Sequence, residues 1–159
     1  MLNGMRSGAE GTALPADVNN GDAPVVVFDS WCPLCVWTVR FVLRRDHGRQ
    51  FLFAALDSPA ARRHLDHAHI DPESIRSILG GSTVALVHRG RVFTRSEAVI
   101  RIAAELPFPF KAAALLRAVP RIVRDGVYSA VANRRHKVWG TLDSCFVPEP
   151  ADRGRFLSS

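Results

Sequence analysis

The 159-residue sequence contains few cysteines, few lysines and no long hydrophobic run. Three cysteines are too few for a disulfide framework, and an odd number leaves one sulfur over if two of them join. No segment approaches the roughly 20 apolar residues that a membrane-spanning helix needs. The N-terminus lacks the basic-then-apolar pattern of a secretory signal. We therefore expect a cytoplasmic protein without a membrane span, whose cysteines serve redox or metal chemistry.

Lysine occurs only at positions 111 and 137, so arginine supplies nearly all of the positive charge behind the net charge of +6. Such a balance is compatible with binding to nucleic acid or to a membrane surface. However, exposed aromatic residues are not expected between the arginines of residues 117–135, which disfavours a nucleic-acid platform. A well-solvated basic surface is the simpler interpretation.

The composition predicts one domain preceded by a leader. Residues 1–23 are rich in Gly, Ala, Asn and Asp without periodicity, so we expect them to be disordered. Residues 24–106 alternate predicted strands and helices and form the expected core. Residues 107–159 add a helical extension and an irregular tail to the same domain.

The segment from Val25 to Cys35 predicts a buried strand, a tight turn and the start of a helix. Residues 25–28 are all apolar, which favours a strand covered on both faces. Pro33 is suited to the first position of a helix, where no backbone donor is needed. Arginines at 44 and 45, followed by Gly48, are typical of a helix end.

This placement has a chemical consequence for the pair Cys32 and Cys35. The N-terminus of a helix favours an anion, so the thiolate of Cys32 would be stabilised there. Cys35 lies three residues further on the same face, within reach of a disulfide. One sulfur could attack a substrate disulfide and the other could resolve the mixed disulfide. A C-x-x-C motif beside a βαβ pattern is typical of a thioredoxin-like redox site.

The remaining pattern predicts an α/β fold with the order β-α-β-α-β-β-α. Residues 50–55 form the second strand, and Ser58 caps a helix that begins at Pro59. Residues 83–88 and 91–94 form a hairpin that turns at Gly90. Ser96 is expected to cap a third helix. Helices at 111–119 and 122–139 follow, so a thioredoxin-like core would carry a C-terminal helical extension.

Two residues beside the cysteines have both a chemical and a structural interpretation. Asp29 could accept the proton of Cys35 through water as a general base, or it could simply cap the helix or end the strand. Trp31 could shield the sulfur and offer an apolar patch to a substrate, or it could only fill space at the sheet edge.

A metal site is the main rival to redox chemistry at the cysteine pair. Cys145 and one of the histidines at 64, 67 and 69 could complete a tetrahedral zinc site, although the spacing matches no known zinc module. Solvated histidines on a helix surface are the simpler interpretation. Cys145 could also relay a disulfide, or it could be a buried thiol that packs as a small apolar group.

The sequence resembles the DCC family of predicted thiol-disulfide oxidoreductases over about residues 24–157. Asp29, Cys32 and Cys35 match the motif that names the family, and Leu34 matches the apolar residue before the second cysteine. Further matches follow along the chain: Ser96-Glu97-Ala98, Pro120-Arg121, Arg124-Asp125, Tyr128, Asn133-Arg134, Gly140, Cys145, Pro148 and Arg155-Phe156-Leu157.

Two departures from related patterns concern the site. The family usually has glycine where this chain has Ser30, and glycine permits a turn with positive φ. Thioredoxins and glutaredoxins carry a cis-proline after a Thr-Val pair that faces the active site. Here Thr83-Val84 is followed by Ala85.

The resemblance implies a thiol-disulfide oxidoreductase that needs no bound cofactor and no metal. Cys32 would be the nucleophile and Cys35 the resolving thiol, with Asp29 as the third catalytic residue. The expected partners are a protein or small-molecule disulfide and a dithiol electron donor. A non-catalytic module that binds a metal or a partner protein through the motif is the second hypothesis. The expected substrate-binding residues are Trp31, Pro33, Leu34, Thr83 and Val84.

Overall fold

The computed structural model of the chain describes residues 23–67, 70, 84–140, 142–143 and 146–157. Residues 1–22 of the expected leader lie outside the described residues, as do Thr83, His69 and Cys145.

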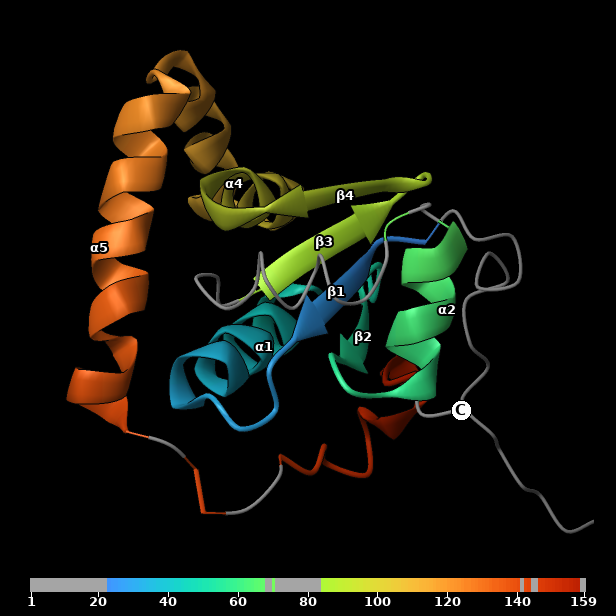
Figure 1. Cartoon of the computed structure of the whole chain (residues 1–159). Coiled ribbons are helices and arrows are strands. Elements are labelled where there is room, and N and C mark those ends of the chain that lie inside the picture. The colour runs from blue at the N-terminus through green and yellow to red at the C-terminus, as the bar shows by residue number, and fades with distance from the viewer. Residues whose placement is uncertain (1–22, 68–69, 71–83, 141, 144–145, 158–159) are drawn as a thin grey trace, which may run out of the picture.

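Four strands form one mixed sheet in the order β2-β1-β3-β4 (Figure 1). β1 (Val25–Phe28) is parallel to β2 (Leu52–Ala55) and antiparallel to β3 (Val84–His88), which is antiparallel to β4 (Arg91–Thr94). The helices α1 (Pro33–Arg45), α2 (Pro59–His67) and α4 (Arg95–Glu105) complete the order β-α-β-α-β-β-α. The predicted thioredoxin-like fold is therefore confirmed.

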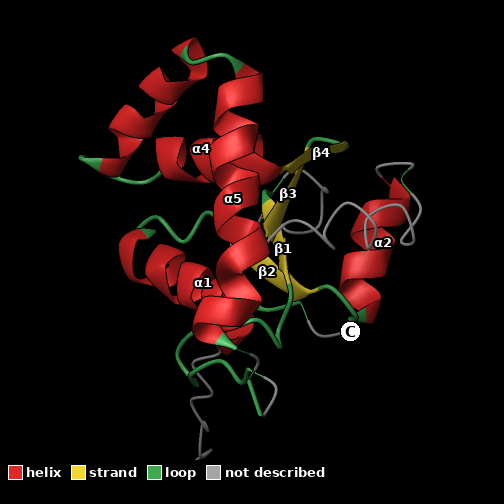
Figure 2. Ribbon diagram, turned by 60° about the vertical axis from the view of Figure 1, so that its left-hand side comes forward, coloured by secondary structure: helices red, strands yellow, loops and turns green. Residues whose placement is uncertain are grey.

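The sheet separates two layers of helices, and each layer has its own apolar cluster. Figure 2 shows α1 and α4 on one side of the sheet and α2 on the other. Val26 and Phe28 of β1 pack in the cluster that contains α1 and α4. Val25 and Val27 pack with α2 in the second cluster. β1 is thus buried on both faces, as its uninterrupted apolar sequence predicts.

α1 ends earlier than its sequence predicts. It begins at Pro33 as expected, but it stops at Arg45 instead of continuing to Gly48. The reason is the side chain of Asp46, which accepts hydrogen bonds from the backbone N–H groups of Gln50 (3.2 Å) and Phe51 (2.9 Å). These bonds turn the chain directly into β2.

The tail is anchored to the core beside β2, although its sequence predicts only irregular structure. The short 3₁₀ helix η3 (Arg153–Arg155) leads to Phe156, whose ring stacks on that of Phe53 with centroids 5.2 Å apart. The N–H of Leu157 donates to the carbonyl of Phe53 (2.8 Å). Arg155 is only 3% exposed, pairs with the buried Asp46 and donates to the carbonyl of Phe51 (3.1 Å).

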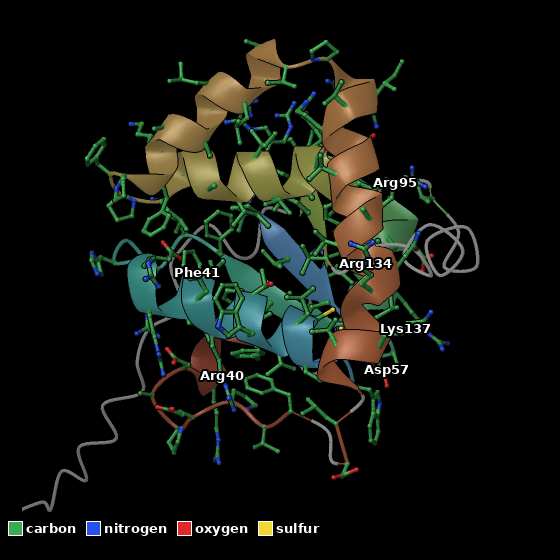
Figure 3. All side chains as sticks on the ribbon, turned by 90° about the vertical axis from the view of Figure 1, so that its left-hand side faces the viewer. Arg40, Phe41, Asp57, Arg95, Arg134 and Lys137 are labelled. Carbon is green, nitrogen blue, oxygen red and sulfur yellow. The ribbon has the colours of Figure 1, made fainter. Side chains whose placement is uncertain are left out.

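Two helical segments follow α4. η2 (Phe110–Ala118) is a 3₁₀ helix, whereas residues 111–119 predict an ordinary helix, and α5 (Arg121–Trp139) is an α-helix as expected. A 3₁₀ helix rises about 2.0 Å per residue compared with 1.5 Å in an α-helix. The residues of η2 therefore extend over a longer distance than the same number of residues would in an α-helix. Figure 3 shows α5 crossing in front of α4 and α1.

Polar side-chain contacts join α4 to α5, and one of them involves Ser96, which the sequence predicts to cap α4. Ser96 does not cap α4, because Thr94 occupies the N-cap position. The hydroxyl of Ser96 donates instead to the carboxylate of Asp125. Arg124 pairs with Glu97 (3.2 Å) in the same region. Burial alone would raise the pKa of Glu97, but its hydrogen bonds and charge pairing with arginines hold that pKa below its ordinary value.

In the part of the chain that the structure describes, no helix has the length and apolar character required to cross a membrane. This agrees with the absence of a long hydrophobic run in the sequence.

The buried pair of Arg155 and Asp46 generates a test of how the tail stabilises the core. Replacing Arg155 with methionine should lower the free energy of unfolding by about 3–5 kcal/mol, because the carboxylate of Asp46 is left buried without its cation. Urea denaturation measures the change. Arg153→Met, at an exposed neighbouring position, should change stability by less than about 0.5 kcal/mol. Equal losses in the two variants would contradict the role of the pair.

Candidate functional site

The turn between β1 and α1 is closed by local hydrogen bonds. The side chain of Asp29 accepts a hydrogen bond from the backbone N–H of Trp31 (2.9 Å). The N–H of Cys32 donates to the carbonyl of Asp29 (3.3 Å), and that of Val36 donates to the carbonyl of Cys32 (3.0 Å). Cys32 is the N-cap of α1 and has no side-chain cap bond, and Cys35 lies in the first turn. Both cysteines therefore lie at the helix start that the sequence predicts.

Cys32 and Cys35 are both buried free cysteines, and their side chains are within hydrogen-bond contact. The hydrogen bond to Cys32 is the largest of the causes that raise the pKa of the Cys35 thiol far above its usual range, followed by burial. A hydrogen bond raises the pKa of its donor, so Cys35 keeps its proton and donates it toward Cys32. Cys32 occupies the N-cap position of α1, and the N-terminal end of a helix favours an anion, so the helix end favours a negative charge on Cys32 over one on Cys35.

Burial of the pair is greater than a helix-end position suggests. Cys32 is 2% exposed and Cys35 is 0% exposed, and both pack in the apolar cluster between the sheet and α1. The sulfur of Cys32 is therefore covered in this conformation.

Asp29 does not cap α1, because Cys32 occupies the N-cap position; its side chain instead accepts the hydrogen bond from Trp31 in the turn that follows β1. It also lies close enough to Cys35 to affect that thiol in two ways. A backbone hydrogen bond from Asp29 lowers the pKa of Cys35, while the negative charge of its carboxylate raises it. Asp29 is thus an electrostatic neighbour of the Cys35 thiol.

Residues of α1 and Leu142 form an apolar hollow of about 420 Å³ near the start of the helix, and neither cysteine lines it. Pro33 and Leu34, both expected to bind substrate, line it. Its other lining residues are Val36, Trp37, Arg40 and Leu142. Trp31, also expected to bind substrate, is 48% exposed, and its carbonyl accepts a hydrogen bond from the N–H of Leu142 (3.0 Å).

Sequence reasoning missed the contributions of Trp37, Arg40 and Leu142 to this hollow. Trp37 and Arg40 follow Pro33 at helical spacing, so periodicity along α1 could have identified them. Figure 3 shows Phe41 on the side of α1 that faces η2 and Arg40 on the opposite side. There the guanidinium of Arg40 lies over the ring of Phe146, 5.3 Å from its centroid. No local pattern predicts the approach of Leu142.

Val84 lies opposite Phe28 in the register of β3 and β1. Its side chain is fully buried and packs in the same cluster as the two cysteines. In this conformation it presents no side-chain surface to a substrate.

Ser30, which replaces the glycine usual in the DCC family, does not occupy the left-handed region. Among the described residues, the non-glycine positions with positive φ are Arg49, Arg89 and Arg95. The turn therefore forms without the special freedom of glycine. The Ser30 hydroxyl is nevertheless buried without a hydrogen-bond partner, an arrangement that costs stability.

The histidines of α2 lie on the other side of the sheet from the cysteines. Residues of α2 pack in the second apolar cluster, whereas Cys32 and Cys35 belong to the first. His64 and His67 therefore cannot share a metal ion with the cysteine pair. Among the described residues, no group of three or more His, Cys, Asp or Glu side chains is arranged to hold a metal ion.

Comparison with known proteins agrees with this geometry. Residues 26–141 match the family model described as DCC1-like thiol-disulfide oxidoreductase. YuxK, an uncharacterized protein of Bacillus subtilis, is 32% identical over 133 residues, which cover 84% of this chain and 93% of YuxK. A DCC family protein of Arabidopsis thaliana, named as chloroplastic, is 39% identical over 124 residues, covering 77% and 68% of the two chains. No solved structure matches the chain.

The unpartnered hydroxyl of Ser30 generates a stability prediction. Ser30→Ala should raise the free energy of unfolding by about 1 kcal/mol, because a buried hydroxyl without a partner costs about 1–3 kcal/mol. Ser58→Ala is the matched control, for which the free energy of unfolding should fall instead of rise. The hydroxyl of Ser58 accepts a hydrogen bond from the N–H of Ala61 (3.1 Å), so its loss should cost about 1 kcal/mol. Destabilisation by Ser30→Ala in urea denaturation would show that this hydroxyl has a stabilising partner.

Proposed function

Because the chain belongs to the DCC1-like thiol-disulfide oxidoreductase family, we propose that it is an enzyme that exchanges disulfides with a protein or small-molecule substrate. Cys32 is the nucleophile and Cys35 the resolving thiol. The observation that carries this proposal is the pair itself: Cys32 caps α1, and the thiol of Cys35 is hydrogen-bonded to it.

The reaction balances as two successive exchanges. The thiolate of Cys32 attacks one sulfur of the substrate disulfide, so a mixed disulfide forms and the other substrate sulfur leaves as a thiolate. Cys35 then loses its proton and attacks the sulfur of Cys32. This step forms the Cys32–Cys35 disulfide and releases the second substrate thiol. The substrate gains two electrons, and a dithiol donor returns the enzyme to its reduced form without a bound cofactor.

The apolar hollow beside the cysteines indicates which substrates fit. Pro33, Leu34 and Trp37 supply apolar surface, and Arg40 adds a positive charge. A disulfide flanked by an apolar side chain would occupy the hollow while its sulfur approaches Cys32. Burial of Cys32 excludes a bulky disulfide until the turn opens, which favours a flexible protein segment or a small molecule. The cytoplasm stays our prediction for the compartment.

Asp29 is proposed to be the base that accepts the proton of Cys35 through water. The proton must leave before Cys35 can attack, and burial, which raises the pKa of the Cys35 thiol, makes that loss unfavourable without a base. Asp29 is placed beside Cys35 by the turn that its own side chain closes.

The direct test is a disulfide reductase assay with dithiothreitol or a thioredoxin system as the electron donor. Cys32→Ser should abolish turnover, because no nucleophile remains. Cys35→Ser should accumulate a mixed disulfide at Cys32, detectable as a mass increase that dithiothreitol reverses. Wild-type turnover by Cys32→Ser would refute the proposal. Stoichiometric zinc in protein purified without added metal, together with absent turnover, would favour the metal-binding module instead.

The role of Asp29 is tested by two variants that separate charge from turn geometry. Asp29→Asn keeps an oxygen that can accept the hydrogen bond from Trp31 but removes the base, so resolution of the mixed disulfide should slow by about a hundredfold. Asp29→Ala removes both functions and should also lower thermal stability. Rapid quenching and mass spectrometry follow the mixed disulfide. If Asp29→Asn resolves it at the wild-type rate, the residue acts only on the turn.

A further inference from the structure

The junction of η2 and α5 presents apolar side chains to solvent. Residues 115–123, here called the elbow, include Leu115, Leu116, Ile122 and Val123, which are 77%, 51%, 88% and 54% exposed. Figures 1 and 3 show η2 and α5 meeting at an end of the molecule that projects beyond the sheet. Large aliphatic side chains exposed together within nine residues are unusual for a surface in contact only with water.

The inner side of the elbow is held by polar contacts. The guanidinium of Arg124 donates to the carbonyl of Val119 (3.0 Å) and pairs with Glu97 of α4. Asp125 accepts a hydrogen bond from Ser96 and pairs with Arg121 (3.3 Å). The apolar tip is therefore attached to α4 through side chains that are largely buried, and its exposure does not result from a frayed helix end.

The charge of the elbow has one sign. Between Glu105 and Asp125 the sequence has no acidic residue, while it has basic residues at 111, 117, 121 and 124. Arg124 is directed inward, but Arg117 and Arg121 are exposed. Two carboxylates of neighbouring segments offset part of this charge: Asp125 pairs with Arg121, and Glu97 pairs with Arg124 and interacts electrostatically with Arg117. The outer surface thus combines aliphatic side chains with arginines that outnumber these two carboxylates.

We propose that the elbow binds the surface of an anionic membrane. Leucine and isoleucine would enter the boundary between headgroups and acyl chains, and the two arginines would pair with lipid phosphates. A second copy of this chain is a poorer partner, because it would bring the same cations against each other. Nucleic acid would use the arginines but offers no apolar site for Leu115 and Ile122. The projecting shape also suits insertion better than docking against a protein.

Sedimentation of the full chain with lipid vesicles tests the proposal. The wild type should bind vesicles of phosphatidylcholine mixed with phosphatidylglycerol, bind pure phosphatidylcholine much less, and dissociate as salt is raised. The double variant Leu115→Asn/Ile122→Asn should bind at least tenfold more weakly, because buried CH₂ groups are lost. The double variant Arg117→Gln/Arg121→Gln should bind anionic vesicles about fivefold more weakly for each arginine that is replaced.

Two control variants match these changes elsewhere on the surface. Arg62→Gln/Arg63→Gln removes two exposed cations from α2, and Val147→Asn removes an apolar side chain that is 70% exposed in the tail. Both should bind anionic vesicles within about twofold of the wild type, since basic attraction falls off within a Debye length of the surface. Circular dichroism confirms that each variant folds, and the disulfide assay is a separate readout that the elbow variants should leave unchanged.

Three results would overturn the proposal. The wild type could fail to bind anionic vesicles at low salt, or the α2 control could lose as much affinity as the elbow variants. Alternatively, ultracentrifugation without lipid could show an oligomer that Leu115→Asn/Ile122→Asn dissociates, which would assign the elbow to contact between copies of the chain.

Discussion

The positions of Cys32 and Cys35 depend on one constraint, the burial of β1 on both faces at the centre of the sheet. Val26 and Phe28 pack toward α1, and Val25 and Val27 pack toward α2, so a shift of the strand by one residue would exchange the side chains that fill the two apolar clusters. β1 ends directly at the turn from which α1 begins. The end of a rigid strand therefore fixes Cys32 at the positive end of the helix dipole.

The same helix is fixed at its other end by the tail. Asp46 terminates α1 and pairs with Arg155, while the ring of Phe156 stacks on Phe53 in β2. Phe156 also meets the ring of Phe28 edge-on, with centroids 6.2 Å apart. The C-terminal residues thus contact the strand that leads to the cysteines. The tail therefore helps to position the cysteine pair, although the two are far apart in the sequence.

Local signals were sufficient for most of the fold and for the placement of the cysteines. The apolar run of β1 and the proline at position 33 define their elements without tertiary information. Three features required the folded chain. The end of α1 is set by hydrogen bonds across a loop, the hydroxyl of Ser96 is taken by Asp125 on α5, and Leu142 reaches the hollow from the far end of the sequence. Burial of Cys32 could not be predicted either, because packing around a turn depends on all the elements that meet there.

The proposed mechanism requires that Cys32 carries the charge of the pair while Cys35 retains its proton. Alkylation by iodoacetamide over a range of pH, with the modified residue identified by mass spectrometry, tests this most directly. The account predicts that Cys32 is modified first. It also predicts that Cys35→Ala shifts the ionisation of Cys32 to higher pH, because the hydrogen bond to its thiolate is lost. Modification of Cys35 before Cys32, or an ionisation of Cys32 that is unchanged in Cys35→Ala, would contradict the account.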